Sequence, residues 1–200
     1  MARWQDVAEQ GWAPRRRVPV ESTAPEEARD RQLDATARAA FDHLRAYGNC
    51  ARATLWAVAT HLGIPAPDAV RAMLGLCGGI AGTGGTCGGV IGGLAALGLG
   101  LGSADLMDAA GQQLVRTASA EFVAEFRKTF GSALCFEVQE GLVGFRNDNP
   151  SKEPAWKAAG GCVACALVCG EAARSAARIV LDRRACASPP QATPGPAPAP

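Results

Sequence analysis

The sequence predicts an all-α fold, a compact bundle of several helices with a glycine-rich loop between two of them. Apolar residues recur at helical spacing through most of the chain, and no segment shows the alternation of apolar and polar residues that is typical of a strand. Aromatic residues make up only 6% of the chain, whereas alanine, leucine and glycine are abundant, which suits closely packed helices. Two hundred residues fit one domain, expected here over residues 23–186.

The first helix is predicted to begin at the capping box Thr23-Ala24-Pro25-Glu26 and to end at Gly48. Asn49 is a good N-cap for a second helix, whose first residue is then Cys50 and which ends at Gly63. The buried faces of these two helices are expected to comprise Leu33, Ala37, Phe41 and Leu44, and Ala51, Leu55, Val58 and Leu62.

A third helix is expected over residues 65–76, with Cys77 in the core at its end. Val70, Met73 and Leu74 share the same predicted face. Beyond it, residues 77–102 carry no charge and are very rich in glycine, which lets backbones approach closely.

Cys87 lies where this glycine loop becomes an apolar helix. Gly88 and Gly92 are expected where that helix crosses another one closely. The uncharged run 72–104 is long enough to suggest a membrane-associated transporter subunit as an alternative. Thirteen glycines interrupt it, so two short buried helices joined by a loop are favoured.

The C-terminal half predicts three further helices. One is expected from Ser103 to Phe130, and a short one should hold Cys135 in its first turn. Residues 139–160 look irregular, and a last helix is expected to begin after Gly160-Gly161 and to run to about Arg183. Residues 1–22 are interpreted as a loosely ordered arm, and the proline- and alanine-rich residues 187–200 as a disordered tail.

Composition narrows the functional classes. The net charge is only +1, so nothing favours binding to nucleic acid or to an anionic membrane surface. No secretory signal is visible, and eight cysteines without one favour metal binding, redox chemistry or catalysis in a reducing compartment over a disulfide scaffold. We therefore expect a cytoplasmic protein.

Four predicted helices start at or near a cysteine, namely Cys50, Cys87, Cys135 and Cys162. Helix N-termini carry a partial positive charge and unpaired N–H groups, which lower a cysteine pKa and favour the thiolate. The pattern suggests that these N-termini converge on one electropositive site.

The last helix adds a choice of thiols. Cys162, Cys165 and Cys169 stand at i, i+3 and i+7, on one helical face. Cys165 is in register with the apolar stripe, so it is favoured over Cys162 as the fourth thiol, and Cys169 is expected at the edge of the site, where it could pair with Cys77. The candidate metal ligands are Cys50, Cys87, Cys135, Cys162 and Cys165. His43 and His61 lie inside helices and are interpreted as core or surface residues.

This cysteine pattern resembles the C-GCAxxG-C-C family of bacterial proteins, which are described as redox-active. The matching pieces are Asn49-Cys50-Ala51, the run from Gly84 to Gly92 around Cys87, Phe130-Gly131-Ser132 with Cys135, and a cysteine that opens the last helix. Gly89 stands where the family usually has alanine. The resemblance implies a compact helical domain that brings four cysteines together for a redox role.

The first functional hypothesis is a redox protein that uses Cys50, Cys87, Cys135 and Cys165, either as thiol/disulfide pairs or as ligands of an iron–sulfur cluster, with an unknown protein as its electron partner. The second is an accessory protein that holds zinc or another thiophilic metal. The sequence does not choose between these chemistries.

Overall fold

The computed structural model describes residues 24–187, and every regular element in this range is a helix. The elements are α2 (Ala24–Tyr47), α3 (Cys50–His61), α4 (Pro67–Ala72), η1 (Met73–Leu76), α5 (Gly88–Leu101), α6 (Ala109–Phe130), α7 (Cys135–Val143), η2 (Pro150–Lys152), α8 (Glu153–Ala158) and α9 (Gly161–Ala187). The predicted all-α class is confirmed. The predicted arm, the predicted Thr23 cap and all but the first residue of the predicted tail lie outside the described residues.

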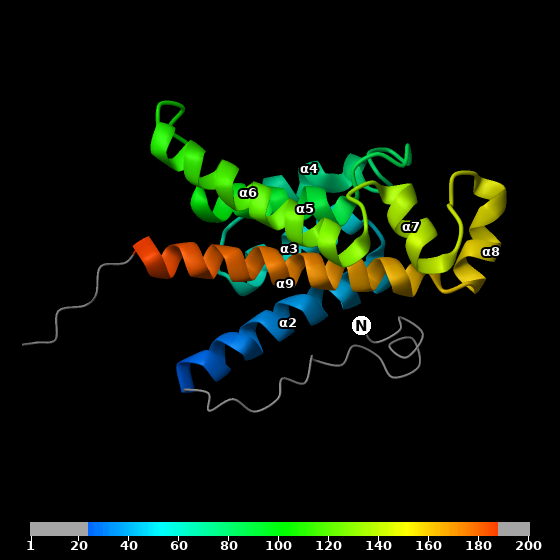
Figure 1. Ribbon diagram of the computed structural model, residues 1–200, viewed down its shortest axis with the longest axis horizontal. Helices are drawn as coiled ribbons and strands as arrows, with labels where there is room; N and C mark the ends of the chain where they lie inside the picture. The colour runs from blue at the N-terminus through cyan, green and yellow to red at the C-terminus, as the bar shows by residue number, and fades with distance from the viewer. Residues whose placement is uncertain (1–23, 188–200) are drawn as a thin grey trace, which may run out of the picture.

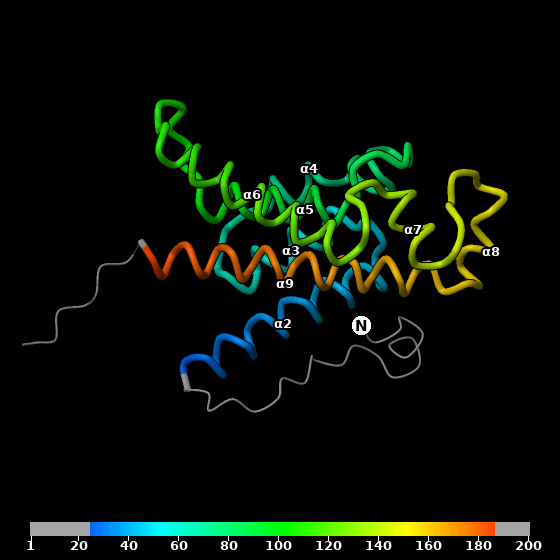
Figure 2. Tube along the Cα trace, in the orientation of Figure 1, coloured from blue at the N-terminus to red at the C-terminus, as the bar shows by residue number. Residues whose placement is uncertain are grey.

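Helix α9 is the axis of the bundle. It runs along the long dimension of the molecule, with α2 crossing on one side, α5 and α6 on the other, and α3 behind it (Figures 1 and 2). The most extensive helix contacts are those of α2 with α9, α3 with α5, and α5 with α9. The buried stripe of α9 is built largely from small residues, so its neighbours approach its backbone closely: Ala166, Ala172, Ala173, Ala176 and Ala177.

Helix α5 packs through glycine on two faces. A Cβ at Gly92 would overlap the carbonyl oxygen of Ala51 in α3, and a Cβ at Gly88 would overlap the Sγ of Cys50. On the opposite face, a Cβ at Gly93 would overlap the ring of Phe122 in α6. The expected close crossing at Gly88 and Gly92 is therefore confirmed, and the partner helix is α3.

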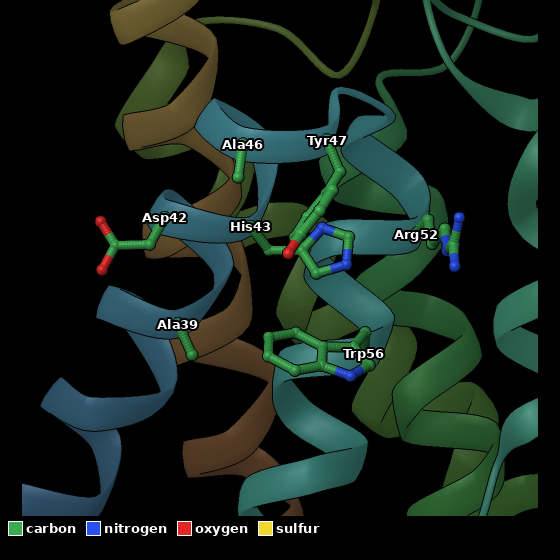
Figure 3. Close-up of a pocket in the computed structure, with 7 residues that line it drawn as sticks. All are labelled: Ala39, Asp42, His43, Ala46, Tyr47, Arg52 and Trp56. Atoms are coloured by element: carbon green, nitrogen blue, oxygen red, sulfur yellow. The ribbon is translucent and has the colours of Figure 1, made fainter.

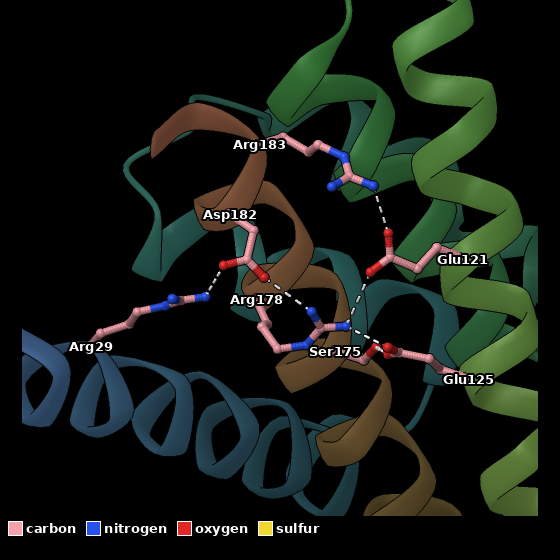
Figure 4. Close-up of polar contacts among 7 residues, drawn as sticks. All are labelled: Arg29, Glu121, Glu125, Ser175, Arg178, Asp182 and Arg183. Carbon is pink, nitrogen blue, oxygen red and sulfur yellow. Dashed lines mark hydrogen bonds and ion pairs between the residues drawn. The ribbon is translucent and has the colours of Figure 1, made fainter. Parts of the chain in front are cut away.

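A network of ion pairs joins α2, α6 and α9 toward the C-terminal end of α9 (Figure 4). Arg178 of α9 is its centre: its guanidinium lies 2.5 Å from Glu125, 3.0 Å from Asp182 and 3.4 Å from Glu121. Asp182 also pairs with Arg29 of α2. Because each carboxylate is shared with another donor, the network fixes the register of three helices.

Two expected helices differ in extent from the prediction, one because another residue caps it and one because it is divided. Helix α6 begins at Ala109 rather than Ser103, since the side chain of Asp108 accepts a hydrogen bond from the Gly111 N–H at 2.8 Å. The predicted helix over 65–76 is divided into α4 and η1, neither of which has a buried residue, and Leu74 is 53% exposed.

The predicted irregular region and the end of the chain hold more helix than expected. Within 139–160, α7 continues to Val143 and α8 adds one short helix over Glu153–Ala158. Helix α9 extends past Arg183 to Ala187. Within residues 24–187, no helix combines the length and the apolar character that crossing a membrane requires.

Candidate functional site

The first cysteine of the site is held by the N-terminus of α3. Cys50 is the first residue of the helix, and Asn49 is its N-cap, as predicted. The Asn49 side chain accepts a hydrogen bond from the Arg52 N–H at 3.0 Å and donates one to the carbonyl oxygen of Leu74 at 2.9 Å. Asn49 therefore caps α3 and also ties the end of η1 to it.

Cys87 and Cys135 are brought side by side by backbone pairing. The N–H of Cys87 donates to the carbonyl oxygen of Ala133 at 2.8 Å, and the N–H of Cys135 donates to that of Gly85 at 2.7 Å. Cys87 is the N-cap of α5 and Cys135 the first residue of α7. This two-stranded contact between distant parts of the chain places two helix N-termini at one point.

Cys50 is the common neighbour of the other thiols. Its sulfur occupies the space that a side chain at Gly88 would need, directly beside Cys87. Its charge as a thiolate would act on Cys87 and Cys135, and also on Cys165 and Cys169 of α9. The four thiols that the sequence favoured, Cys50, Cys87, Cys135 and Cys165, thus lie within electrostatic range of one another.

The three cysteines that open α9 occupy different environments. Cys162 is exposed, Cys165 is partly buried, and Cys169 is fully buried. The thiol of Cys169 donates to the carbonyl oxygen of Cys50 across a sulfur–oxygen distance of 3.6 Å. The expectation that Cys169 would lie at the edge of the site is wrong, because the register of α9 directs it into the contact with α3. Its pairing with Cys77 stays a prediction.

Cys77 and Cys186 complete the set of eight. Cys77 is only partly buried, not in the core as expected, and its charge would act on Cys50 and Cys135. Cys186 is exposed near the end of α9. At a rise of 1.5 Å per residue, it is about 30 Å along the helix from Cys165.

Burial raises the pKa of the clustered thiols. Loss of solvent raises the pKa of Cys87 to about 12 and that of Cys135 to about 11, and the neighbouring thiols add to both shifts. The pKa values of Cys165 and Cys169 are raised well above the ordinary thiol value for the same reason. The prediction of lowered pKa values at these helix N-termini is wrong, because desolvation of the sulfur outweighs the helix N–H groups.

Cys50 differs from Cys87 and Cys135 in its exposure to solvent and in the groups that act on its pKa. Burial raises its pKa too, but the N–H groups of Gly78, Ala51 and Cys50 itself act in the opposite direction. It is also more exposed than Cys87 and Cys135, which are 6% and 5% accessible. Among these three thiols, Cys50 is therefore the one most open to attack from solution.

One polar residue of the site was not found from the sequence. The Gln139 amide donates to the sulfur of Cys135 at 3.3 Å, and its oxygen accepts a hydrogen bond from the Asn147 N–H at 2.8 Å. A glutamine four residues after a cysteine on a helix shares its face, which is the signal that could have identified it.

The described residues do not form a ready metal site. Between residues 24 and 187, no three or more His, Cys, Asp or Glu side chains are grouped so that they could hold a metal ion. Cys162, a predicted metal ligand, is exposed. The predicted ligand set of Cys50, Cys87, Cys135, Cys162 and Cys165 therefore stays a prediction.

A concavity of about 560 Å³ lies between α2 and α3, and no cysteine lines it (Figure 3). The ring of His43 packs against Trp56 and Tyr47, with centroids 4.7 and 4.9 Å away. Burial and the charge of Arg52 lower the pKa of His43. As expected from the sequence, His43 lies in a helix packing surface.

A family model described as "Putative redox-active protein (C_GCAxxG_C_C)" matches residues 48–181. The chain belongs to this family. The C_GCAxxG_C_C match spans every thiol of the cluster and leaves only Cys186 outside. Comparisons with curated proteins and with solved structures find no match.

Proposed function

We propose that this member of the C_GCAxxG_C_C family is a thiol–disulfide redox protein that works with Cys50 and Cys87 as its exchanging pair. The observation that carries the proposal is the position of the Cys50 sulfur, which lies against Gly88 beside Cys87. This sulfur is within electrostatic range of Cys87, Cys135 and Cys165. The family's description as redox-active supports it.

Cys50 is assigned as the attacking thiol because of its access and its hydrogen bonds. It is partly exposed, and although burial raises its pKa, three N–H groups partly offset that shift by favouring its thiolate. Cys87 suits the resolving role, since a buried thiol with a high pKa stays protonated until the mixed disulfide is beside it.

The reaction is an exchange with a disulfide of another molecule. The Cys50 thiolate attacks one sulfur of that disulfide, forms a mixed disulfide and releases the first thiolate of the substrate. Cys87 then loses its proton and attacks the Cys50 sulfur, which forms the Cys50–Cys87 disulfide and releases the second thiolate. The two electrons leave the protein with the substrate thiols, and the two protons of the protein thiols balance their charge.

Cys135 and Cys165 complete the site in this proposal as flanking thiols. Both lie within electrostatic range of the pair, and burial keeps both protonated near neutral pH. Each would have to lose that proton before it could take up the disulfide by further exchange. We place this chemistry in the cytoplasm, because free cysteines persist in a reducing compartment.

The test is anaerobic purification followed by oxidation with oxidised glutathione, with metal and sulfide analysis of the same sample. We expect one intramolecular disulfide, mapped to Cys50 and Cys87, and no stoichiometric metal. The Cys50→Ser variant should lose it, and the Cys186→Ser variant should behave as the parent because Cys186 is far from the cluster. Stoichiometric iron with sulfide, or zinc, bound through Cys50 and Cys87 would overturn the proposal in favour of the metal alternatives.

A further inference from the structure

Cys77 lies outside the four motifs that mark the family, yet its chain neighbours contact the proposed site. It follows η1 directly, and it remains partly exposed, whereas Cys87 is buried. The sequence by itself suggested a place in the core, which it does not occupy, and a pairing with Cys169.

The two glycines after Cys77 carry the contact. The N–H of Gly78 is directed at the sulfur of Cys50. A Cβ at Gly79 would come within 2.7 Å of the Cβ of Cys135. Consecutive residues therefore touch two thiols of the cluster, and Cys77 lies immediately before them.

The loop that holds Cys77 is closed by backbone hydrogen bonds between its own residues. The Gly82 N–H donates to the Cys77 carbonyl oxygen at 3.1 Å, and the Gly84 N–H donates to that of Gly78 at 3.1 Å. Neither α4 nor η1 has a buried residue. Segments with few buried apolar contacts open at low free energy, so this loop can move toward α3 while the core stays intact.

The same loop holds two residues in an unfavourable backbone conformation. Ile80 and Ala81 have φ values of 64° and 51°, a region that side chains other than glycine rarely adopt. Ile80 is also 45% exposed. A rearrangement of the loop that releases this conformation is less costly than one in a relaxed turn.

We propose that Cys77 is a third exchanging thiol, which carries the disulfide from the buried Cys87 to the surface. This inference rests on the proposed function. The Cys77 thiol loses its proton and attacks the Cys50 sulfur of the Cys50–Cys87 disulfide. The Cys50–Cys77 disulfide forms, and Cys87 leaves as a thiolate and takes up a proton. The step needs no external oxidant, because one disulfide replaces another.

The consequence concerns access by the reducing partner. A dithiol protein must bring its thiolate in line with a disulfide sulfur. In the Cys50–Cys87 disulfide only the Cys50 end is accessible, because Cys87 as a residue is 6% exposed. The Cys50–Cys77 disulfide has a partly exposed residue at each end, so it offers a second accessible sulfur, on the loop. The expected partner is therefore a protein dithiol that docks at the loop of residues 77–85.

The experiment compares the full chain with Cys77→Ser and with the matched control Cys186→Ser. Each protein is oxidised with oxidised glutathione, its disulfides are mapped after acid quenching and alkylation, and its reduction by thioredoxin is followed. In the parent and in the control, we expect both Cys50–Cys87 and Cys50–Cys77 peptides. In Cys77→Ser, the Cys50–Cys87 disulfide should still form, but thioredoxin should reduce it roughly tenfold more slowly.

Two outcomes separate this inference from the proposed function. If the parent forms Cys50–Cys87 but no Cys50–Cys77, or if thioredoxin reduces Cys77→Ser as fast as the parent, the role of Cys77 is overturned alone. If the parent forms no Cys50–Cys87 disulfide, the proposed function fails first. Cys77→Ala, with helicity checked by circular dichroism, repeats the comparison if the serine variant is misfolded.

Discussion

The substitution Gly92→Ala tests the packing that positions Cys50. A Cβ at Gly92 would overlap the carbonyl oxygen of Ala51 and lie 2.8 Å from the Cβ of Thr54 and 3.0 Å from the backbone nitrogen of Leu55. Two of these three atoms belong to the backbone of α3, so they move only if the helix moves. Gly98, on the same helix, has no atom within 4 Å of a Cβ and is the matched control.

The two substitutions are expected to have opposite signs. Gly98→Ala should raise the free energy of unfolding by about 0.5–1 kcal/mol, since it removes unfolded-state entropy and creates no clash. Gly92→Ala gains the same term, but it should lose about 1–3 kcal/mol through overpacking. At about 2–4 °C per kcal/mol for a domain of this size, the Tm of Gly92→Ala should lie several degrees below that of Gly98→Ala.

Thermal unfolding of both variants by circular dichroism, with the reduced parent as reference, measures this difference. The alkylation rate of Cys50 in the native state is a second readout, because a displaced α3 exposes its first residue. Equal Tm values for Gly92→Ala and Gly98→Ala would show that α3 does not press on α5 in solution. The account of how Cys50 is placed beside Cys87 would then be refuted.

Three further predictions concern charge. The pKa of Cys87 is raised to about 12, so the native state keeps a proton that the unfolded state loses above about pH 9. The free energy of unfolding should therefore fall by about 1 kcal/mol through this thiol by pH 10. Urea unfolding at pH 7 and pH 10 measures the loss, and Cys87→Ala, which lacks the thiol, is the comparison. The pKa of His43 is lowered, so acidification through about pH 6.5 should favour the unfolded state. This part of the dependence of the unfolding free energy on pH should be absent in His43→Gln. An unchanged dependence in that variant would contradict the lowered pKa. Arg178→Met removes the centre of the ion-pair network and leaves Glu125 and Asp182 without that partner. The free energy of unfolding should fall by about 1–2 kcal/mol at low salt and by less at 1 M salt. A decrease that does not depend on salt would indicate lost packing instead of lost ion pairs.

Local signals in the sequence were sufficient for most of the helices. Asn49 predicts the start of α3 because its side chain satisfies an N–H of the first turn, and Gly131 predicts the end of α6 because it adopts a left-handed conformation, with φ 81°. Ser103 misled the prediction of α6, since Asp108 is a competing cap a few residues later. Choices between two nearby caps depend on the rest of the fold, and a single sequence does not contain that information.

The sequence by itself determined which cysteines begin helices and that Gly88 and Gly92 belong to a close crossing, because capping and small-residue spacing are properties of short segments. Only the tertiary structure decided which thiols meet. The pairing of residues 84–87 with 133–136 joins Cys87 to Cys135, the register of α9 buries Cys169 against α3, and the loop after η1 brings Cys77 near Cys50. The tertiary structure also reversed the sign of the expected pKa shifts, because the solvation lost by a sulfur depends on everything packed around it and not on the helix that carries it.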